Sequence, residues 1–414
     1  MRSEPAINPL RRFDLTRQFL QLAAAFVLLS ACATQPFQYD SALSSAVKGR
    51  AITETTGEVT VSTSVPGEEE TTSIFGVPMY ERGIQPVWIE VVNNSDDFLR
   101  LALSSIDREY FSPIEVAYLH RKGFSKSARA EMERRFYDSA MPRSIPAGES
   151  RSGYVFTHAN PGTKSFNVDL YSNANDYSFA FFVTVPGFIP DHQAVSFKDL
   201  YSEEEFRNYD LTGFRTALSE QQWFTKSKSG QPGLPVSVVI VANGLDTLKA
   251  LLRAGWYEQP DTRDLVDAQT AHYMFGRLPD ASFRTRRDDK SERNELYVWQ
   301  TPLRVNGEVV WMGRIVHFIG QRNQIRQVLF GARIDPNVDE GRNYFMQNIW
   351  YSQSLEQLAW LEMSDPVPID EPARDFNDTE YFTDGYLAVA WLSGEPVSLI
   401  ETTRVDWDSQ PHRK

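Results

Sequence analysis

Acidic residues that follow a histidine are the first group whose types and spacing suit catalysis. Asp335, Asp339 and Glu340 lie close together in the sequence, and His317 precedes them. Carboxylate oxygens and an imidazole nitrogen can bind a hard divalent ion or activate a hydrolytic water. The same residues suit the start of a helix, because Asp335 precedes Pro336 and negative charge is favourable in a first turn. The sequence leaves both interpretations open and favours helix capping.

Arginine is concentrated in one part of an acidic chain. The 414 residues carry a net charge of −13, whereas the segment 271–343 contains eleven Arg, one Lys and nine acidic residues. The planar arginine side chain binds carboxylate and phosphate through parallel hydrogen bonds. We therefore expect Arg277, Arg314 and Arg333 to bind an acidic or phosphorylated ligand. The alternative, which is the more common arrangement, is that such arginines lie along exposed strands or pair with nearby acids.

Other catalytic signatures are absent from the sequence. It contains no nucleophile elbow, P-loop, dinucleotide-binding fingerprint or HExxH motif, and its six histidines are scattered. The single cysteine, Cys32, excludes an internal disulfide framework and a multi-cysteine metal site. The negative net charge argues against nonspecific binding to nucleic acid. We expect no cofactor and no metal.

The residues before Cys32 are typical of a secretory signal. Four arginines precede an apolar run, Phe19 to Ala31, which is about 20 Å long as a helix. That length is too short for the roughly 30 Å hydrocarbon core of a bilayer, but it suits a signal peptide over residues 1–31. The segment Leu29 to Cys32 resembles the bacterial lipobox, in which the cysteine is lipidated. A plain signal peptide with an incidental cysteine is the alternative.

The lipobox resemblance implies a location. Ala33 follows Cys32, whereas lipoproteins retained in the inner membrane often have Asp there. We expect a lipoprotein anchored on the periplasmic face of the outer membrane of a Gram-negative bacterium. Removal of residues 1–31 leaves 383 residues with a net charge of −15. Anionic head groups repel such a chain, so the lipid anchor must make the membrane contact.

The first half of the chain is predicted to be a β-domain. Residues 32–51 are polar and indicate a tether, and short apolar–polar alternations with turn residues recur over 52–195. This pattern is typical of an antiparallel, immunoglobulin-like β-sandwich. A helix is predicted over 125–137, which contains helix formers and no breaker. An acidic linker over 196–214 ends this half.

The second half, residues 215–407, is predicted to be a mixed α/β domain, so that the whole chain is α+β and multidomain. The run 236–242 predicts a buried strand, and leucines over 245–254 predict a helix that ends at Gly255. Asn306-Gly307 predicts a hairpin turn between two apolar segments. A long helix is expected from Asp335-Pro336 to Met363, and a last strand over 386–392.

The order of motifs in this half resembles the LssY C-terminal domain family. The resemblance covers about residues 232–392 and rests on the order of these segments: PVSVVIVANGLDTLKALLRAGW (235–256), FGRLPDASF (275–283), an arginine-rich stretch before YVWQT (297–301), VWMGRIVHFIG (310–320), ARIDPNVDEGRNYF (332–345) and YFTDGYLAVAWL (381–392). The resemblance implies a domain that stands alone or is joined to membrane proteins with phosphatase-like segments. No reaction is established for the family, so no phosphatase activity is implied.

The expected function is that of a noncatalytic binding or envelope-assembly factor. Its partners would be the membrane, through the lipid anchor, and an unknown envelope protein or anionic ligand. The alternative is a periplasmic metal-dependent or acid/base-dependent hydrolase of a phosphorylated or glycan substrate, using His317, Asp335 and Asp339. A surface adhesion module is a third hypothesis.

Overall fold

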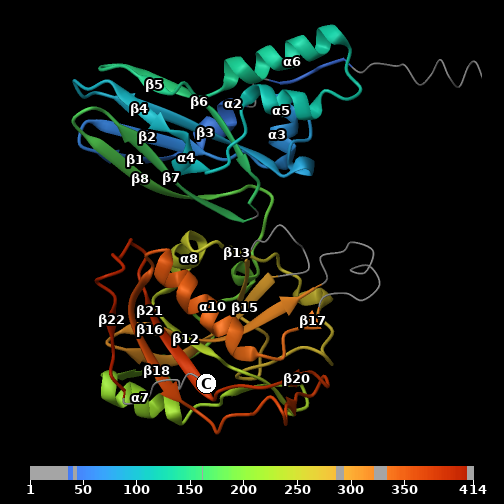
Figure 1. Ribbon diagram of the computed structural model, residues 1–414, viewed down its shortest axis with the longest axis vertical. Helices are drawn as coiled ribbons and strands as arrows, with labels where there is room; N and C mark the ends of the chain where they lie inside the picture. The colour runs from blue at the N-terminus through green and yellow to red at the C-terminus, as the bar shows by residue number, and fades with distance from the viewer. Residues whose placement is uncertain (1–35, 41–43, 161, 286–292, 321–332, 408–414) are drawn as a thin grey trace, which may run out of the picture. The chain divides into compact units, whose positions relative to one another are not determined.

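The computed structural model describes residues 36–40, 44–160, 162–285, 293–320 and 333–407 (Figure 1). Over these residues the fold is mixed α+β, as predicted, with several antiparallel pairings and more strand than helix. The chain divides into two compact units, Met1–His158 and Ala159–Lys414. In the described ranges, no helix is long and apolar enough to cross a membrane.

The first unit contains an antiparallel sheet of four strands in the order β1-β2-β3-β6. Its strands are β1 (Ile52–Thr56), β2 (Val59–Ser64), β3 (Ile84–Asn93) and β6 (Ser150–His158). Gly57 closes the β1–β2 turn with a φ of 59°, a conformation that glycine adopts without strain. Apolar residues alternate along β2, so one face of the sheet is buried.

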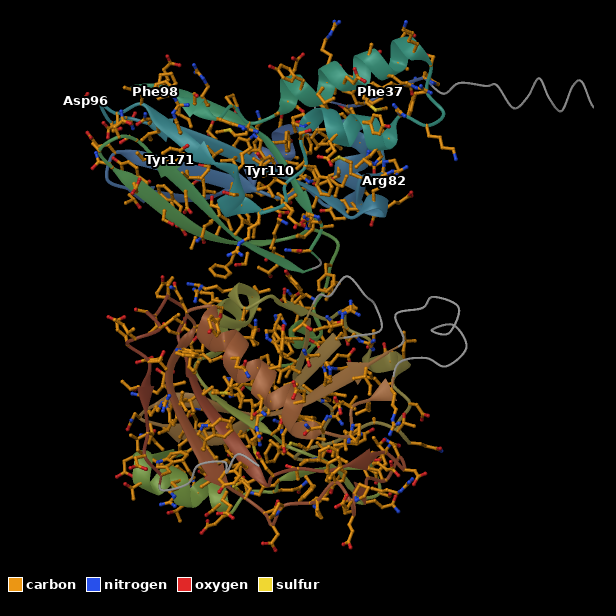
Figure 2. All side chains as sticks on the ribbon, in the orientation of Figure 1. Phe37, Arg82, Asp96, Phe98, Tyr110 and Tyr171 are labelled. Carbon is orange, nitrogen blue, oxygen red and sulfur yellow. The ribbon has the colours of Figure 1, made fainter. Side chains whose placement is uncertain are left out.

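Helices of the first unit enclose an aromatic core. Phe75 of α3 (Glu68–Phe75) stacks on Phe136 of α6 (Lys126–Ser139), with ring centroids 5.2 Å apart, and contacts Phe156 edge-on. Phe37, labelled in Figure 2, lies near these helices. Its ring packs edge-on against that of Phe124, with centroids 6.1 Å apart. Helix α6 confirms the helix predicted over 125–137, and the Ser125 hydroxyl caps it by accepting from the Ala128 N–H. The other elements are α2 (Ser44–Gly49), η1 (Tyr80–Arg82), β4 (Leu99–Ala102), α4 (Leu103–Ile106), α5 (Pro113–His120) and β5 (Ser144–Ile145).

The second unit is built around a ten-stranded mixed sheet, counted over the described residues. Its central strands are β15 (Arg293–Val305), β16 (Glu308–Ile319), β12 (Val238–Val241) and β21 (Tyr386–Leu392). β12 pairs antiparallel with β16 and parallel with β21. The predicted hairpin is confirmed: Asn306 and Gly307 join β15 to β16 with φ values of 50° and 89°.

The outer strands complete this sheet and smaller elements surround it. The sheet continues through β14 (Ala281–Thr285) to β13 (Trp256–Glu258) on one side and through β18 (Leu355–Glu362) to β22 (Thr403–Arg404) on the other. β9 (Arg207–Tyr209) pairs with β15, and β17 (Arg333–Ile334) pairs with β16. β7 (Thr163–Tyr171) and β8 (Asp176–Thr184) belong to a separate four-stranded sheet, in the order β5-β4-β7-β8. The remaining elements are η2 (Asp191–Ala194), β10 (Phe224–Lys226), β11 (Pro232–Pro235), η3 (Arg263–Leu265), β19 (Ala373–Arg374) and β20 (Glu380–Tyr381).

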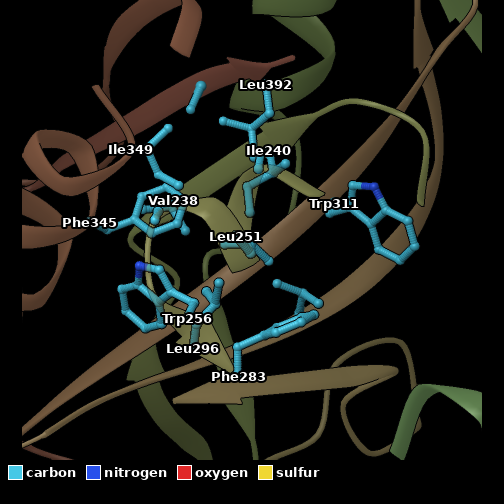
Figure 3. Close-up of a cluster of buried hydrophobic side chains, with 14 of the residues drawn as sticks. Val238, Ile240, Leu251, Trp256, Phe283, Leu296, Trp311, Phe345, Ile349 and Leu392 are labelled. Carbon is cyan, nitrogen blue, oxygen red and sulfur yellow. The ribbon is translucent and has the colours of Figure 1, made fainter. Parts of the chain in front are cut away.

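Three helices cover the two faces of the sheet. Val238 and Ile240 of β12 share a buried cluster with α8 (Gly244–Arg253) and α10 (Val338–Tyr351), part of which Figure 3 shows. The alternate residues Val239 and Val241 pack instead with α7 (Leu211–Ser219). Each large apolar side chain buried in this way contributes roughly 1.5–3 kcal/mol. β12 is therefore buried on both faces, as its sequence predicted.

The predicted long helix is wrong beyond Tyr351. Helix α10 ends there, and Gln353 adopts a φ of 59°, which breaks the helical path. The following residues form β18, which pairs antiparallel with β21. A strand partner that lies some thirty residues later in the chain thus prevails over the local helical preference of the sequence.

Candidate functional site

A buried arginine lies in the middle of β16. The side chain of Arg314 belongs to a residue that is 7% exposed, and its Nε atom has no hydrogen-bond partner. Within the part of the chain that the structure describes, Arg314 forms no ion pair; Asp375 and Glu295 act on it only from beyond ion-pair distance. Burial lowers the pKa of Arg314, although an arginine remains cationic at neutral pH. A buried charge without a partner is costly, which is typical of a site that a ligand completes.

A polar cavity of about 250 Å³ lies beside this arginine. Ser282 of β14, Tyr297 of β15 and Arg314 occupy matching register positions on three neighbouring strands, so their side chains share one face of the sheet. The neighbouring residues Ala281 and Phe283 point to the opposite face and join the apolar core. The lining also includes Asp191 of η2, Arg263 of η3, and the loop residues Thr270 and His272.

His272 is a neutral group in this cavity. Its Nδ1 lies 2.8 Å from the Thr225 hydroxyl, which itself donates to the Leu234 carbonyl at 2.9 Å. The hydroxyl has one proton to donate, so His272 Nδ1–H must be the donor to Thr225. Burial and the charge of Arg314 lower the pKa of His272 to about 2. The imidazole therefore adds no positive charge at physiological pH.

Asp191 supplies a carboxylate to the same cavity. Its Oδ2 accepts a hydrogen bond from the Ser282 hydroxyl at 2.5 Å, whereas its Oδ1 is buried and has no partner. Burial raises the pKa of Asp191 to about 6, so the group is mostly ionised at neutral pH. Arg263 donates to the backbone carbonyls of Asp191 and Asp280, at 2.9 and 3.2 Å, and holds this loop against β14.

The strands that carry the cavity also carry the family motifs. Residues 269–387 match the family described as LssY C-terminus. This match confirms the resemblance predicted from the order of the motifs. No curated protein matches the chain. The LssY C-terminal segment includes His272, Ser282, Tyr297 and Arg314, whereas Asp191 precedes it.

Of the three arginines predicted to bind a ligand, only Arg314 lines this cavity of the LssY C-terminal segment. Arg277 instead pairs with Asp280 through two hydrogen bonds of 2.8 and 3.0 Å, and it also donates to the Tyr201 hydroxyl and the Gln300 carbonyl. Arg333 has a side chain that is 68% exposed and lies 3.8 Å from Glu380. The three arginines therefore do not share one pocket.

The predicted acid/base residues of the LssY C-terminal segment have other hydrogen-bond partners. His317 Nδ1 lies 2.8 Å from Asn294 Oδ1, and Asp335 Oδ1 accepts from the backbone N–H of Asn337 at 2.9 Å. Asp339 accepts from the Thr383 hydroxyl and the Asp384 N–H, and lies 3.2 Å from buried Arg342. Over the described ranges, no hydrogen bond or ion pair joins the His317 ring to either carboxylate.

The helix that these acids were expected to cap begins later than predicted. Helix α10 starts at Val338, so Asp339 lies in its first turn as expected, but Asn337 occupies the cap position and Asp335 lies outside the helix. No group of three or more His, Cys, Asp or Glu residues able to hold a metal occurs in the described part of the chain. Cys32 and the predicted signal peptide, residues 1–31, lie outside the described residues.

Sequence reasoning missed Asp191, His272, Ser282 and Tyr297. Tyr297 and Ser282 lie in segments that were predicted as strand or motif, but nothing local distinguishes them from ordinary strand residues. The feature that distinguishes them is a row of polar residues across one face of the sheet. This row is recognisable only once the register of β14, β15 and β16 is known. Asp191 comes from η2, far away in the sequence, and carried no such signal.

Proposed function

We propose that the second unit is a noncatalytic binding module for a small anionic ligand. The observation that carries the proposal is the cationic side chain of Arg314, which is buried at the cavity and has no ion-pair partner among the described residues. A carboxylate or phosphate group of the ligand would accept hydrogen bonds from the guanidinium edge and neutralise its charge. This interaction offsets the desolvation penalty of burying the Arg314 cation.

The chemistry of His272 and Tyr297 favours binding over catalysis. His272 has a pKa of about 2, so its imidazole stays neutral and is a very weak base near neutral pH. The Tyr297 hydroxyl donates to Glu295 at 2.5 Å, and burial raises the pKa of Tyr297 above its usual value. Neither group is therefore prepared for proton transfer at physiological pH, whereas Arg314 is prepared for binding.

We propose that this module is held at the periplasmic face of the outer membrane by a lipid on Cys32. The support is the sequence of residues 19–33, with its short apolar run and lipobox-like end. In this proposal residues 32–51 form a tether, 52–195 an immunoglobulin-like β-sandwich, 196–214 a linker and 215–407 the binding domain. The antiparallel pairing of β1, β2, β3 and β6 supports the sandwich.

Isothermal titration of the purified full-length chain with acetate and inorganic phosphate tests the binding proposal. We expect Arg314→Gln to weaken binding of the better anion by about tenfold or more, because a charged hydrogen bond is lost. The matched control is Arg333→Gln, which removes an exposed arginine and should change the affinity less than twofold. Equal affinities of wild type and Arg314→Gln would overturn the proposal.

Two further measurements separate a ligand-binding arginine from other roles. In the absence of anions, Arg314→Gln should unfold at the same or a higher denaturant concentration than wild type, since it removes a buried charge that has no ion pair. A large loss of stability would instead assign Arg314 a structural role. Metal analysis of the same wild-type preparation tests the hydrolase with His317, Asp335 and Asp339, because a stoichiometric divalent metal would favour that enzyme.

A further inference from the structure

We infer that the ligand of the Arg314 cavity is a zwitterion whose amine binds the buried carboxylate of Asp191. This inference rests on the proposed function and specifies the class of anion that the site accepts. The ligand would place its anionic group against the guanidinium of Arg314 and its ammonium group against Asp191. The basis of this inference is that one small cavity has opposite charges, Arg314 and Asp191, at its two ends.

Asp191 provides a buried and oriented carboxylate that can bind the amine. The residue is 7% exposed and lines the cavity, and the Ser282 hydroxyl fixes the orientation of its carboxylate through Oδ2. The other oxygen, Oδ1, is buried without a hydrogen-bond partner. A buried carboxylate oxygen that no protein donor satisfies needs a donor from outside the chain.

The sheet sets the separation of the two charges. Ser282, Tyr297 and Arg314 lie side by side on β14, β15 and β16, so Ser282 and Arg314 are two strand spacings apart, about 10 Å at the backbone. Because Asp191 is bonded to Ser282, its carboxylate lies at the β14 end of this row, whereas the guanidinium lies at the β16 end. The cavity of about 250 Å³ suits a ligand of amino-acid to dipeptide size.

Charge selects an amine over a neutral donor. An anion without an amine would gain the attraction of Arg314 but would also meet the negative charge of Asp191, which bulk water screens little at a buried position. The charge of the nearby Arg263 lowers the pKa of Asp191 but forms no ion pair with it among the described residues. The Arg263 guanidinium donates instead to the carbonyl oxygens of Asp191, Pro279 and Asp280. An ammonium group would satisfy Oδ1 and neutralise the carboxylate in one contact.

Titration of the full-length chain at pH 7.5 with three six-carbon acids tests this inference. 6-Aminohexanoate carries charges at both ends, hexanoate carries only the carboxylate, and norleucine is the isomer with adjacent charges. We expect 6-aminohexanoate to bind at least about tenfold tighter than hexanoate, and norleucine to bind no tighter than hexanoate. Equal affinities for 6-aminohexanoate and hexanoate, or for 6-aminohexanoate and norleucine, would overturn the inference.

The Asp191→Asn variant locates the second contact. It should bind 6-aminohexanoate and hexanoate with affinities within about twofold of each other, without weakening hexanoate; a preserved tenfold preference would contradict the assignment to Asp191. If this variant does not fold, wild type is titrated at pH 5 instead, where protonation of Asp191 should remove the preference. Loss of Arg314-dependent binding of every anion would sink the proposed function, whereas anion binding without an amine preference would sink this inference alone.

Discussion

The guanidinium carbon of Arg314 lies 4.7 Å from the centre of the Tyr297 ring, and the two residues face each other across β16 and β15. The ring supports the cation through its π-face but supplies no negative charge and no hydrogen-bond acceptor to Arg314. Arg314 is therefore held in place while its hydrogen-bonding capacity is kept for a ligand.

Removing the ring should weaken anion binding. We predict that Tyr297→Leu lowers the affinity for the anion that wild type binds by roughly fivefold to thirtyfold, because a desolvated cation–π contact contributes about 1–2 kcal/mol. Tyr297→Phe keeps the ring and serves as the matched control, with an expected change below about threefold. Calorimetric titration of both variants gives the comparison, and an unchanged affinity in Tyr297→Leu would count against the supporting role of the ring.

Arg277 should matter for stability rather than for binding. Its guanidinium pairs with Asp280, a carboxylate on a residue that is 1% exposed, so Arg277→Gln leaves a buried charge without its partner. We predict a loss of about 3 kcal/mol in the free energy of unfolding, measured by urea denaturation. Arg374→Gln, which breaks two exposed ion pairs, is the control and should cost less than about 1 kcal/mol. Similar losses in the two variants would refute this difference.

Asp191 should make the stability of the ligand-free protein depend on pH. Burial raises its pKa from 3.8 to about 6, so between these values the folded state binds more protons than the unfolded state. The contribution of protonated Asp191 to the free energy of unfolding is therefore present at low pH and is lost as the pH rises through about 6. The difference between the two pKa values of Asp191 corresponds to at most about 3 kcal/mol in the free energy of unfolding.

Asp191→Asn removes this pH dependence. We predict that the variant is more stable than wild type at pH 7.5, and that the difference in stability shrinks as the pH falls through about 6 and is lost near pH 4. Chemical denaturation across that pH range provides the measurement. Asp370→Asn changes an exposed aspartate and should stay within about 0.5 kcal/mol of wild type. A variant less stable than wild type at pH 7.5 would show that the carboxylate is not destabilising.

The lipid anchor depends on one sulfur atom. We predict that Cys32→Ser moves the protein from the membrane fraction to the soluble fraction of the envelope and abolishes incorporation of labelled fatty acid, because no other cysteine is present. Fractionation with and without the substitution gives the result. Membrane retention of the Cys32→Ser chain would show that another segment makes the contact.

Local sequence patterns predicted much of the secondary structure of the second unit. The run around Val238 to Val241 predicted a doubly buried strand because every residue in it is apolar, and Asn306-Gly307 predicted a hairpin because both residues tolerate a positive φ. Leucines at helical spacing before Gly255 predicted α8 within a residue of its bounds. These features depend on periodicity and turn geometry, which neighbouring residues determine.

The sequence by itself also determined that arginine is concentrated in segment 271–343. It did not distinguish Arg277 from Arg314, since acidic residues lie within reach of both along the chain. Only the tertiary structure decided that Arg277 is paired with Asp280 and that Arg314 faces a cavity with Asp191 at its other end. The physical reason is that pairing depends on which strands and loops meet: β14, β15 and β16 set the row, and η2, from a distant part of the chain, supplies the opposite charge.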